Sequence, residues 1–225
     1  MFKKNFSLIK FNSFKLEVKC KLFFQANNLE EIVKLSKSKE FKKENYFILG
    51  EGSNILFTKN YNGVIIKNNI IGKEIIKENK TKYLVKIGAG ENWHKFVQWT
   101  INKKMYGLEN LSLIPGSVGA APIQNIGAYG VEVKKYIKEV HAVNLKTGKQ
   151  KIFNNEECEF SYRNSIFKKK LKNKYIITNV IFNLNKNFKI HDKYQGVKHE
   201  IQKLKNKKIT SNDISKIIIK IRNYK

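Results

Sequence analysis

The pattern of apolar and polar positions predicts strands and helices alternating along the chain. Short runs rich in β-branched and aromatic residues favour strands, which we expect at 46–49, 64–66, 83–87, 140–145 and 175–184. Apolar residues at helical spacing favour helices around 29–35 and 93–101. The first strand runs into a glycine turn at Gly50. The chain therefore begins with an α/β pattern.

The tail of the chain predicts an amphipathic helix. Four isoleucines fall on one stripe at helical spacing: Ile214, Ile217, Ile218 and Ile221. Ser211 or Asn212 is expected to cap the first turn, because a short polar side chain there can accept a hydrogen bond from a free main-chain N–H group.

Length and composition indicate a folded protein. The chain has 225 residues, 41% of them hydrophobic, which is enough to bury one large core or two small ones. No apolar run approaches the roughly 20 residues of a membrane helix, and residues 1–5 lead into no signal-like stretch. We therefore expect a cytoplasmic protein with no membrane partner.

Cys20 and Cys158 lie far apart without metal-ligand spacing, so we expect two reduced thiols and no metal site.

The net charge of +27 raises the question of a nucleic-acid partner. Of the 45 basic residues only Arg163 and Arg222 are arginine, and the lysines are scattered through every segment. Drift toward A/T-rich codons produces such a pattern, and arginine is the preferred bidentate reader of bases and phosphates. A solvated lysine surface is therefore the favoured interpretation, and we expect no nucleic-acid partner.

Residues that fix special backbone angles are concentrated in one stretch. Both prolines, Pro115 and Pro122, and five of the 13 glycines lie within 107–130. The run IPGSVGAAPIQNIGAYG over 114–130 leaves room for a planar or extended ligand against the main chain. A glycine-rich connection between elements is the alternative, but connections of about 4–6 residues do not need this length.

A second candidate is the glycine turn LGEGSNIL over 49–56. Its glycines let a ligand approach the main chain and point successive N–H groups at one spot, which suits a pyrophosphate. Ser53 and Asn54 can add side-chain donors. By spacing alone a structural turn is the commoner explanation, since the turn is not the GxGxxG of a dinucleotide-binding fold.

The third candidate is FSYRNSIFK over 160–168, which contains Arg163. A guanidinium is the group best shaped to hold a carboxylate or a developing enolate through two parallel hydrogen bonds. An arginine between a tyrosine and an asparagine is, alone, more often a surface or ion-pair residue.

Taken together and in this order, the three motifs resemble those of the UDP-N-acetylenolpyruvoylglucosamine reductases. Further segments extend the resemblance over essentially the whole chain: SLIKFNSF at 7–14, GAGENW at 88–93 and GLENL at 107–111. The resemblance implies an α+β, two-lobed FAD-binding fold of the PCMH and vanillyl-alcohol-oxidase type. It implies one lobe at 1–70, a second at 71–190, and a helical segment at 191–225 leading to a substrate domain.

The same resemblance implies the reaction and the residues. NADPH reduces FAD, and the reduced flavin reduces UDP-N-acetylenolpyruvoylglucosamine to UDP-N-acetylmuramate for peptidoglycan synthesis, in a protein expected to be a monomer. The implied catalytic residue is Arg163, with Tyr162, Tyr194 and Lys225 at the substrate. The implied cofactor-binding residues are Gly50, Glu51, Gly52, Ser53, Asn54, Gly90, Pro115, Gly116, Gly119, Asn125, Gly127, Ala128, Tyr129 and Gly130.

The chain departs from the family at its end. Family members continue beyond the position of Lys225 into a domain that supplies a serine proton donor and a catalytic glutamate. We therefore expect this chain by itself to be impaired in turnover. A flavin-binding remnant without turnover and a basic nucleic-acid-binding protein remain as alternatives, and bound flavin would separate the first from the second.

Overall fold

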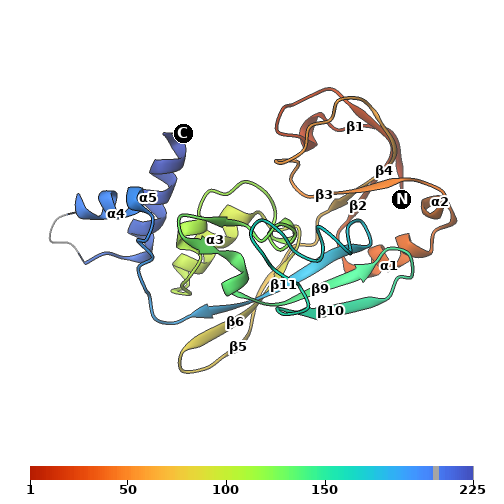
Figure 1. The fold of residues 1–225 in the computed structure, drawn as a ribbon. Coiled ribbons are helices and arrows are strands. Elements are labelled where there is room, and N and C mark those ends of the chain that lie inside the picture. The colour runs from red at the N-terminus through yellow and green to blue at the C-terminus, as the bar shows by residue number, and fades with distance from the viewer. Residues whose placement is uncertain (205–207, 225) are drawn as a thin grey trace.

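The computed structural model describes residues 1–204 and 208–224 and contains two main β-sheets, one after the other along the chain. Figure 1 shows the four-stranded sheet at one end of the molecule, the five-stranded sheet in the middle and the C-terminal helices at the other end. This order in space follows the order in sequence, because each sheet is completed before the chain moves on.

The first sheet has the strand order β1-β2-β4-β3. Its strands are β1 (Lys3–Ser7), β2 (Lys19–Ala26), β3 (Tyr46–Leu49) and β4 (Tyr61–Asn68). β1 and β2 are antiparallel, whereas β4 runs parallel to both β2 and β3. The crossover between β2 and β3 carries α1 (Leu29–Lys37) and α2 (Lys39–Lys42), capped by the side chains of Asn28 and Ser38.

The second sheet is antiparallel throughout, with the order β10-β9-β11-β6-β5. Its strands are β5 (Lys73–Glu78), β6 (Lys82–Gly88), β9 (Ile137–Asn144), β10 (Gln150–Asn154) and β11 (Tyr175–Asn185). Helix α3 (Trp93–Asn102) follows β6, and its buried face packs Trp93 and Phe96 against Phe182 of β11. This packing anchors the loops that leave the helix.

Between α3 and β9 the chain is mostly irregular, with short elements only. They are η2 (Glu109–Leu111), η3 (Val118–Ala120), β7 (Gly127–Ala128), β8 (Val131–Glu132) and η4 (Val133–Lys135), and a further short turn, η1 (Ile9–Phe11), lies in the first lobe. The long loop expected at 114–130 is therefore a defined structure whose backbone lies across the middle of the molecule.

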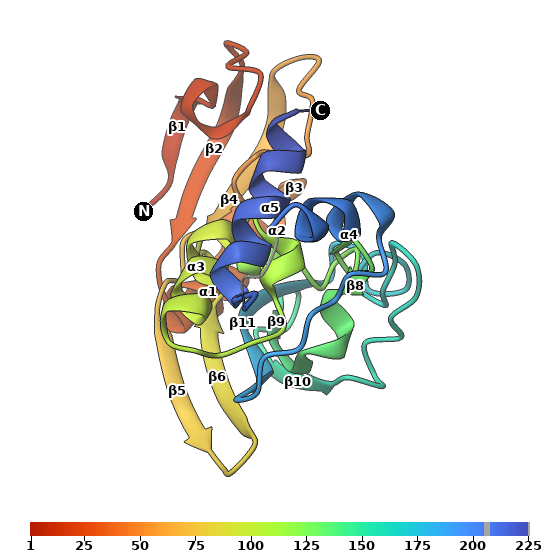
Figure 2. The ribbon, with the colours of Figure 1, turned by 90° about the vertical axis from the view of Figure 1, so that its left-hand side faces the viewer.

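The C-terminal segment forms α4 (Gln195–Gln202) and α5 (Ser211–Asn223), which lie together toward the viewer in Figure 2. Three isoleucines of the expected stripe, Ile214, Ile217 and Ile218, are buried with Val197 of α4, and Ile221 is partly buried against them. The expected cap at Ser211 or Asn212 was wrong. Thr210 caps α5, because its hydroxyl accepts from the Asp213 N–H while the Asp213 carboxylate accepts from the Thr210 N–H.

The two sheets share an apolar core. Ile32 and Leu35 of α1 and Val64 of β4 lie in one buried cluster with Val143 and Ile176 of the second sheet. A boundary at residue 70 thus separates the two sheets, but the two lobes share one apolar core across it.

Both cysteines are buried free thiols. Among the described residues, no helix has the length and apolar character needed to span a membrane.

Candidate functional site

The glycine turn after β3 has a backbone that only glycine can adopt without strain. Gly52 has φ +69°, and a Cβ on it would lie 1.9 Å from the main-chain oxygen of Phe11. The Ser13 N–H donates to the Gly52 carbonyl over 3.2 Å, and the Ser13 hydroxyl donates to the same oxygen over 3.1 Å. The turn at 50–54 is therefore held in place by the segment 11–13.

In this turn, protein donors engage main-chain carbonyls, while several main-chain N–H groups have no protein acceptor. The ammonium of Lys67 on β4 donates to the Gly50 carbonyl over 2.7 Å, so the carbonyls of Gly50 and Gly52 are both engaged. Burial lowers the pKa of Lys67, while the charge of Glu51 acts in the opposite direction. Within the described residues, the N–H groups of Glu51, Gly52 and Ser53 donate to no protein acceptor. They are available to a ligand.

The long loop forms the opposite wall. Gly116 has φ +122°, and a Cβ there would come within 3.3 Å of the Ser53 hydroxyl oxygen. The Ser117 hydroxyl oxygen lies 2.8 Å from the position of a Cβ on Gly50. The two motifs therefore face each other across a space that added side-chain atoms would fill, and that space is a cavity of about 310 Å³.

The cavity is lined mainly by main chain and small or apolar side chains. Its lining includes Gly50, Glu51, Gly52, Ser53, Asn54, Trp93, Ile114, Pro115, Gly116, Ser117, Gln124 and Lys168. A second cavity of about 400 Å³ shares Gly50, Ser117 and Lys168 with it and adds Gly119, Lys172 and Tyr175. The two cavities therefore adjoin each other where the first sheet faces the loops of the second lobe.

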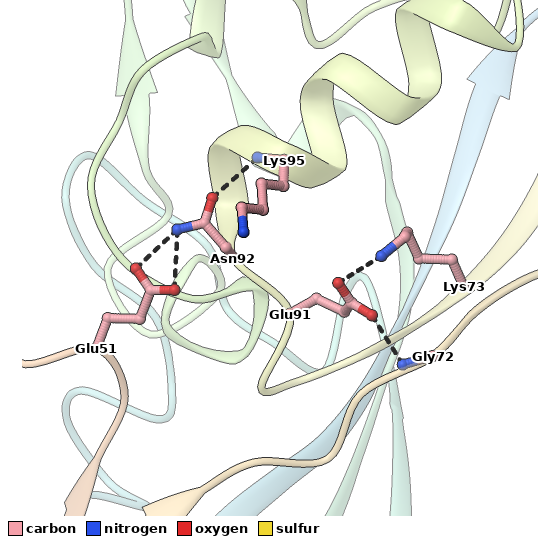
Figure 3. A network of polar contacts seen from close by, with 6 residues as sticks. All are labelled: Glu51, Gly72, Lys73, Glu91, Asn92 and Lys95. Atoms are coloured by element: carbon pink, nitrogen blue, oxygen red, sulfur yellow. Dashed lines mark hydrogen bonds and ion pairs between the residues drawn. The ribbon is translucent and has the colours of Figure 1, made fainter.

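A polar network ties the glycine turn to helix α3. The Nδ2 of Asn92 donates to both carboxylate oxygens of Glu51 over 2.9 Å, while Asn92 Oδ1 accepts from the Lys95 N–H and caps the helix. Figure 3 shows Glu51 reaching Asn92 across the interface. The neighbouring Glu91 accepts from the Gly72 N–H and from the Lys73 ammonium at 2.9 and 2.5 Å. The carboxylate of Glu51 therefore joins the two lobes.

Gly90 and Asn125 fix the positions of the chain segments around the cavity. A Cβ on Gly90 would lie 2.7 Å from the main chain of Asn69, so close packing of the two chain segments requires glycine there. Asn125 is fully buried, and its amide donates to the Ser161 carbonyl over 3.0 Å while its oxygen accepts from the Lys134 N–H. Asn125 thereby connects the long loop to the turn that carries Arg163.

A third cavity of about 410 Å³ opens beside the far end of the long loop. It is lined by Ile114, Gly127, Ala128, Tyr129, Arg163, Tyr194 and Arg222. Ile114 also lines the first cavity, so the two lie on either side of one loop residue. Tyr129 and Tyr194 meet edge to face with ring centroids 5.0 Å apart. Of the residues proposed at the substrate, Tyr162 is 83% exposed and Lys225 lies outside the described residues.

Arg163 lies at a tight turn. Its φ is +52°, and the main chains of Ser161 and Asn164 exchange hydrogen bonds on either side of it. The Lys168 ammonium donates to the Arg163 carbonyl over 2.9 Å, and the Ser165 hydroxyl donates to the Ile123 carbonyl over 2.7 Å. The turn is therefore fixed both to itself and to the long loop.

Three contributors to the site were missing from the sequence prediction. Lys67 carries no sequence signal, because it is one among many lysines, and Lys168 was not singled out within the motif at 160–168 for the same reason. Arg222 did carry one, since it is one of only two arginines in the chain. Gly130 has φ +81° next to Tyr129, which explains the glycine at that position.

The matching family is described as an FAD binding domain, and the match covers residues 20–154. Curated relatives named UDP-N-acetylenolpyruvoylglucosamine reductase align with most of the chain. The relative from Flavobacterium johnsoniae is 46% identical over 98% of this chain and 65% of its own length. That from Buchnera aphidicola is 44% identical over 97% of this chain and 64% of its own length. The chain thus spans a little under two thirds of these relatives.

Solved structures show the same fold. A UDP-N-acetylenolpyruvylglucosamine reductase from Thermus caldophilus superposes with a TM-score of 0.68 at 19% identity, covering 100% of this chain and 70% of its own. A cholesterol oxidase gives a TM-score of 0.61 at 10% identity over 83% of this chain and 38% of its own. These similarities and the family match confirm the expected fold class, the α+β PCMH-type FAD-binding fold.

Proposed function

The chain belongs to the FAD-binding domain family and resembles the UDP-N-acetylenolpyruvoylglucosamine reductases along nearly its whole length, and from this we propose that it is the flavin-binding part of such a reductase. When bound, FAD supplies hydride transfer from NADPH to the enolpyruvyl group of UDP-N-acetylenolpyruvoylglucosamine, giving UDP-N-acetylmuramate. The protein's own residues bind the reactants, orient them and stabilise charge.

The single observation that carries the proposal is the main-chain cradle between the glycine turn and the long loop. A Cβ at Gly50 would lie 2.8 Å from the Ser117 hydroxyl oxygen of the long loop, and a Cβ at Gly116 would lie 3.3 Å from the Ser53 hydroxyl oxygen of the turn. The turn and the loop therefore come together at these two glycines, and a cavity is left between them. The free N–H groups of 51–53 suit a pyrophosphate, since successive main-chain donors form an anion-binding concavity. The residues present therefore fit FAD.

We assign the pyrophosphate to the glycine turn and the isoalloxazine to the neighbourhood of the long loop. The proposed cofactor contacts that line the cavities are Gly50, Glu51, Gly52, Ser53, Asn54, Pro115, Gly116, Gly119, Gly127, Ala128 and Tyr129. Gly90, Asn125 and Gly130 complete the proposed set, and the first two are supported by the packing that they give to the loops.

The proposed catalytic residue is Arg163. Arg163 lines the cavity next to the long loop, and its guanidinium can hold the substrate carboxylate by two parallel hydrogen bonds. Such a contact stabilises the negative charge that develops when a hydride adds to the enolpyruvyl group. Tyr194 lines the same cavity, and Tyr162 is next to Arg163 in the sequence, so both belong to the proposed substrate site.

The proposal extends to the setting of the reaction. We place the protein in the cytoplasm, as a monomer, in peptidoglycan precursor synthesis and hence in the control of cell shape and division. Residues 1–70 and 71–190 form the two flavin-binding lobes, and 191–225 form the helical segment that follows them. The matched relatives are longer than this chain, so the complete reaction is proposed for the protein with the substrate domain of such a relative.

The first test of the proposal is whether the chain binds FAD. The purified chain is reconstituted with FAD, freed of excess and denatured, and the released flavin is measured by absorbance. We expect stoichiometric release, because no histidine or cysteine lies in 50–54, 88–90 or 114–130 to form a covalent link. Absence of flavin after reconstitution would contradict the proposal. Reduction by NADPH and reoxidation by substrate are then followed separately by stopped flow, which distinguishes a reductase from a flavin carrier without turnover.

A further inference from the structure

The Lys67 ammonium and a free N–H group of the glycine turn belong to the two ends of one peptide unit. The ammonium donates to the Gly50 carbonyl over 2.7 Å, and that carbonyl shares its peptide with the Glu51 N–H. In the described part of the chain, the Glu51 N–H donates to no protein acceptor. A donor at the carbonyl end polarises a peptide, because linked hydrogen bonds strengthen one another. Lys67 therefore makes the Glu51 N–H a stronger donor to an anion.

A second peptide of the turn has the same arrangement. The Gly52 carbonyl accepts from the Ser13 N–H over 3.2 Å and from the Ser13 hydroxyl over 3.1 Å, and its peptide carries the free Ser53 N–H. The peptide that joins Glu51 to Gly52 has no protein donor at its carbonyl within residues 1–204 and 208–224. Two of the three free N–H groups are therefore strengthened from outside the turn, one by a cation and one by neutral donors.

Lys67 has no carboxylate partner for its charge. It forms no ion pair within the described residues, and Glu51, whose charge acts on it across the turn, directs its carboxylate to the Asn92 amide instead. Lys67 is half-buried on β4, between the buried residues Ile66 and Asn68. A cation that is partly removed from water and lacks an anionic partner is stabilised by an anionic ligand nearby.

The effect of Lys67 on a ligand is indirect. Lys67 is not among the residues that line the cavity of about 310 Å³, whereas Gly50, Glu51, Gly52 and Ser53 all line it. The parallel pairing of β3 with β4 brings the ammonium to the Gly50 carbonyl. A ligand at the free N–H groups and the ammonium therefore act on opposite ends of one peptide.

We propose that Lys67 is a positioning residue for the diphosphate of the cofactor: through the Gly50 carbonyl, it strengthens the Glu51 N–H as a donor to a phosphate oxygen. Ser13 has the same role, in weaker form, at the Gly52 carbonyl. The inference rests on the proposed function for the identity of the ligand, whereas the polarised peptides are a property of the turn itself.

The experiment titrates the folded 225-residue chain with three ligands. FAD carries the diphosphate and the flavin, riboflavin carries the flavin alone, and ADP carries a diphosphate without the flavin. The variants are Lys67→Met, which removes the charge and keeps the length of the side chain, Lys67→Arg, which keeps a cationic donor, and Ser13→Ala, which removes the hydroxyl. Lys4→Met is the matched control, because it removes an exposed charge from the same sheet.

We expect Lys67→Met to weaken FAD and ADP binding roughly ten- to hundredfold, the range for loss of a charged hydrogen bond, and to leave riboflavin binding unchanged. Lys67→Arg should bind FAD nearly as well as the wild type, since a guanidinium also donates to a carbonyl. Ser13→Ala should weaken FAD binding less than Lys67→Met, because the Ser13 N–H still donates to the Gly52 carbonyl. Lys4→Met should bind all three ligands as the wild type does.

Nuclear magnetic resonance on the ligand-free chain separates polarisation from a general loss of structure. The amide nitrogen resonance of Glu51 reports on the hydrogen bond at the Gly50 carbonyl, because both atoms belong to one peptide. It should move in Lys67→Met, return toward its wild-type position in Lys67→Arg and stay in place in Lys4→Met. Unfolding temperatures show which variants fold, and Lys67→Gln replaces Lys67→Met, with the same expectations, if the latter does not.

Three results would overturn the proposal: equal FAD affinities for Lys67→Met and Lys4→Met, equal losses of FAD and riboflavin affinity, or a Glu51 resonance that Lys67→Met leaves unmoved. In each case, FAD bound by the wild type keeps the proposed function standing. A wild-type chain that binds ADP through Lys67 but binds no FAD would instead overturn the proposed function and leave the polarised diphosphate site standing. A chain that binds neither would overturn both.

Discussion

At the scale of single residues, the site depends on a residue whose backbone is held in an uncommon conformation. Arg163 has φ +52°, a value uncommon for residues other than glycine, asparagine and aspartate. Hydrogen bonds between Ser161 and Asn164 and from the Asn125 amide to the Ser161 carbonyl keep the turn in this form. These contacts hold the backbone of Arg163 in its strained conformation and place the residue at the cavity that it lines.

Arg163→Lys should keep flavin binding and weaken the chemistry. An ammonium retains the charge but cannot reproduce the planar fork, so we expect reoxidation of reduced flavin by substrate to slow by about tenfold or more. The measurement is stopped flow on the protein extended with a substrate domain, with Lys169→Arg as a control at an exposed position of the same segment. An unchanged rate would show that Arg163 is structural.

Glu109 presents a different residue-scale effect, because it is a carboxyl buried without full compensation. One oxygen accepts from the Gly107 N–H over 2.9 Å, and the other has no partner in the described residues. Burial is the main cause that raises the pKa of Glu109 to about 7 from 4.5. The protonated form therefore stabilises the fold below about pH 4.5, and this contribution is lost as pH rises through about 7.

Glu109→Gln should remove this pH dependence. Relative to the wild type, the variant should gain stability as pH rises from 5 to 8, by a few kcal/mol at most, because each pKa unit corresponds to about 1.4 kcal/mol. Urea unfolding across that range checks the expectation, and equal pH profiles for the two proteins would refute it. Glu91→Gln, at a carboxylate paired with Lys73, is the control and should not show this gain.

At the scale of elements, the glycine turn is set by contacts from outside it. Glycine is required at position 52 for two reasons. Its φ is +69°, and the main-chain oxygen of Phe11 lies 1.9 Å from where a Cβ would be. Gly72 has φ +132° but nothing within 4 Å of such a Cβ. Alanine substitutions at these two glycines therefore separate the cost of backbone strain from the cost of a steric collision.

Gly52→Ala should lower stability and FAD affinity together, whereas Gly72→Ala should lower stability alone. Strain at a single residue costs on the order of 1–3 kcal/mol, and the collision adds displacement of the turn to this cost. Thermal unfolding and FAD titration on both variants measure the two effects. Full FAD affinity in Gly52→Ala would mean that the turn does not hold the pyrophosphate.

The elements differ in how well sequence predicts them, and burial explains much of the difference, although the half-buried β2 was not predicted either. β4 and β11 contain long buried runs of isoleucine, valine and phenylalanine, so their apolar pattern identified them. β5 reads KEIIKE and is exposed along its length, and β1 and β10 are also largely exposed. They form by pairing with a neighbouring strand, which leaves no periodic signal. The cap of α5 was misplaced by one or two residues for a similar reason, since Thr210, Ser211 and Asn212 are all good caps.

The site shows the same division. Glycines and Arg163 could be proposed from the sequence because their residue types are scarce or conformationally special in this chain. Lys67 could not, since only the parallel pairing of β3 with β4 brings its ammonium to the Gly50 carbonyl. Contacts that depend on topology were beyond what spacing in the sequence indicates.

At the scale of the whole molecule, the charge of +27 should govern weak, unspecific contacts while leaving the cofactor unaffected. Binding to duplex DNA should fall steeply with salt, by roughly 10³–10⁵-fold between 50 and 200 mM if 6–10 phosphates are contacted, and show no sequence preference. FAD affinity should change little, because uncharged N–H groups face the pyrophosphate in the proposed complex. Fluorescence titrations at several salt concentrations check both, and sequence-selective DNA binding at 200 mM would contradict the expectation.

The apolar cluster shared by the two sheets has a consequence for biosynthesis. Ile32, Leu35 and Val64 are buried together with Val143 and Ile176, so the first sheet cannot complete its packing until β11 has been made. At about 5–20 residues per second, a ribosome needs roughly 5–20 s to travel from residue 70 to residue 176. Throughout that interval the nascent chain exposes apolar surface that chaperones can bind, although the sheet's own strands have already been translated.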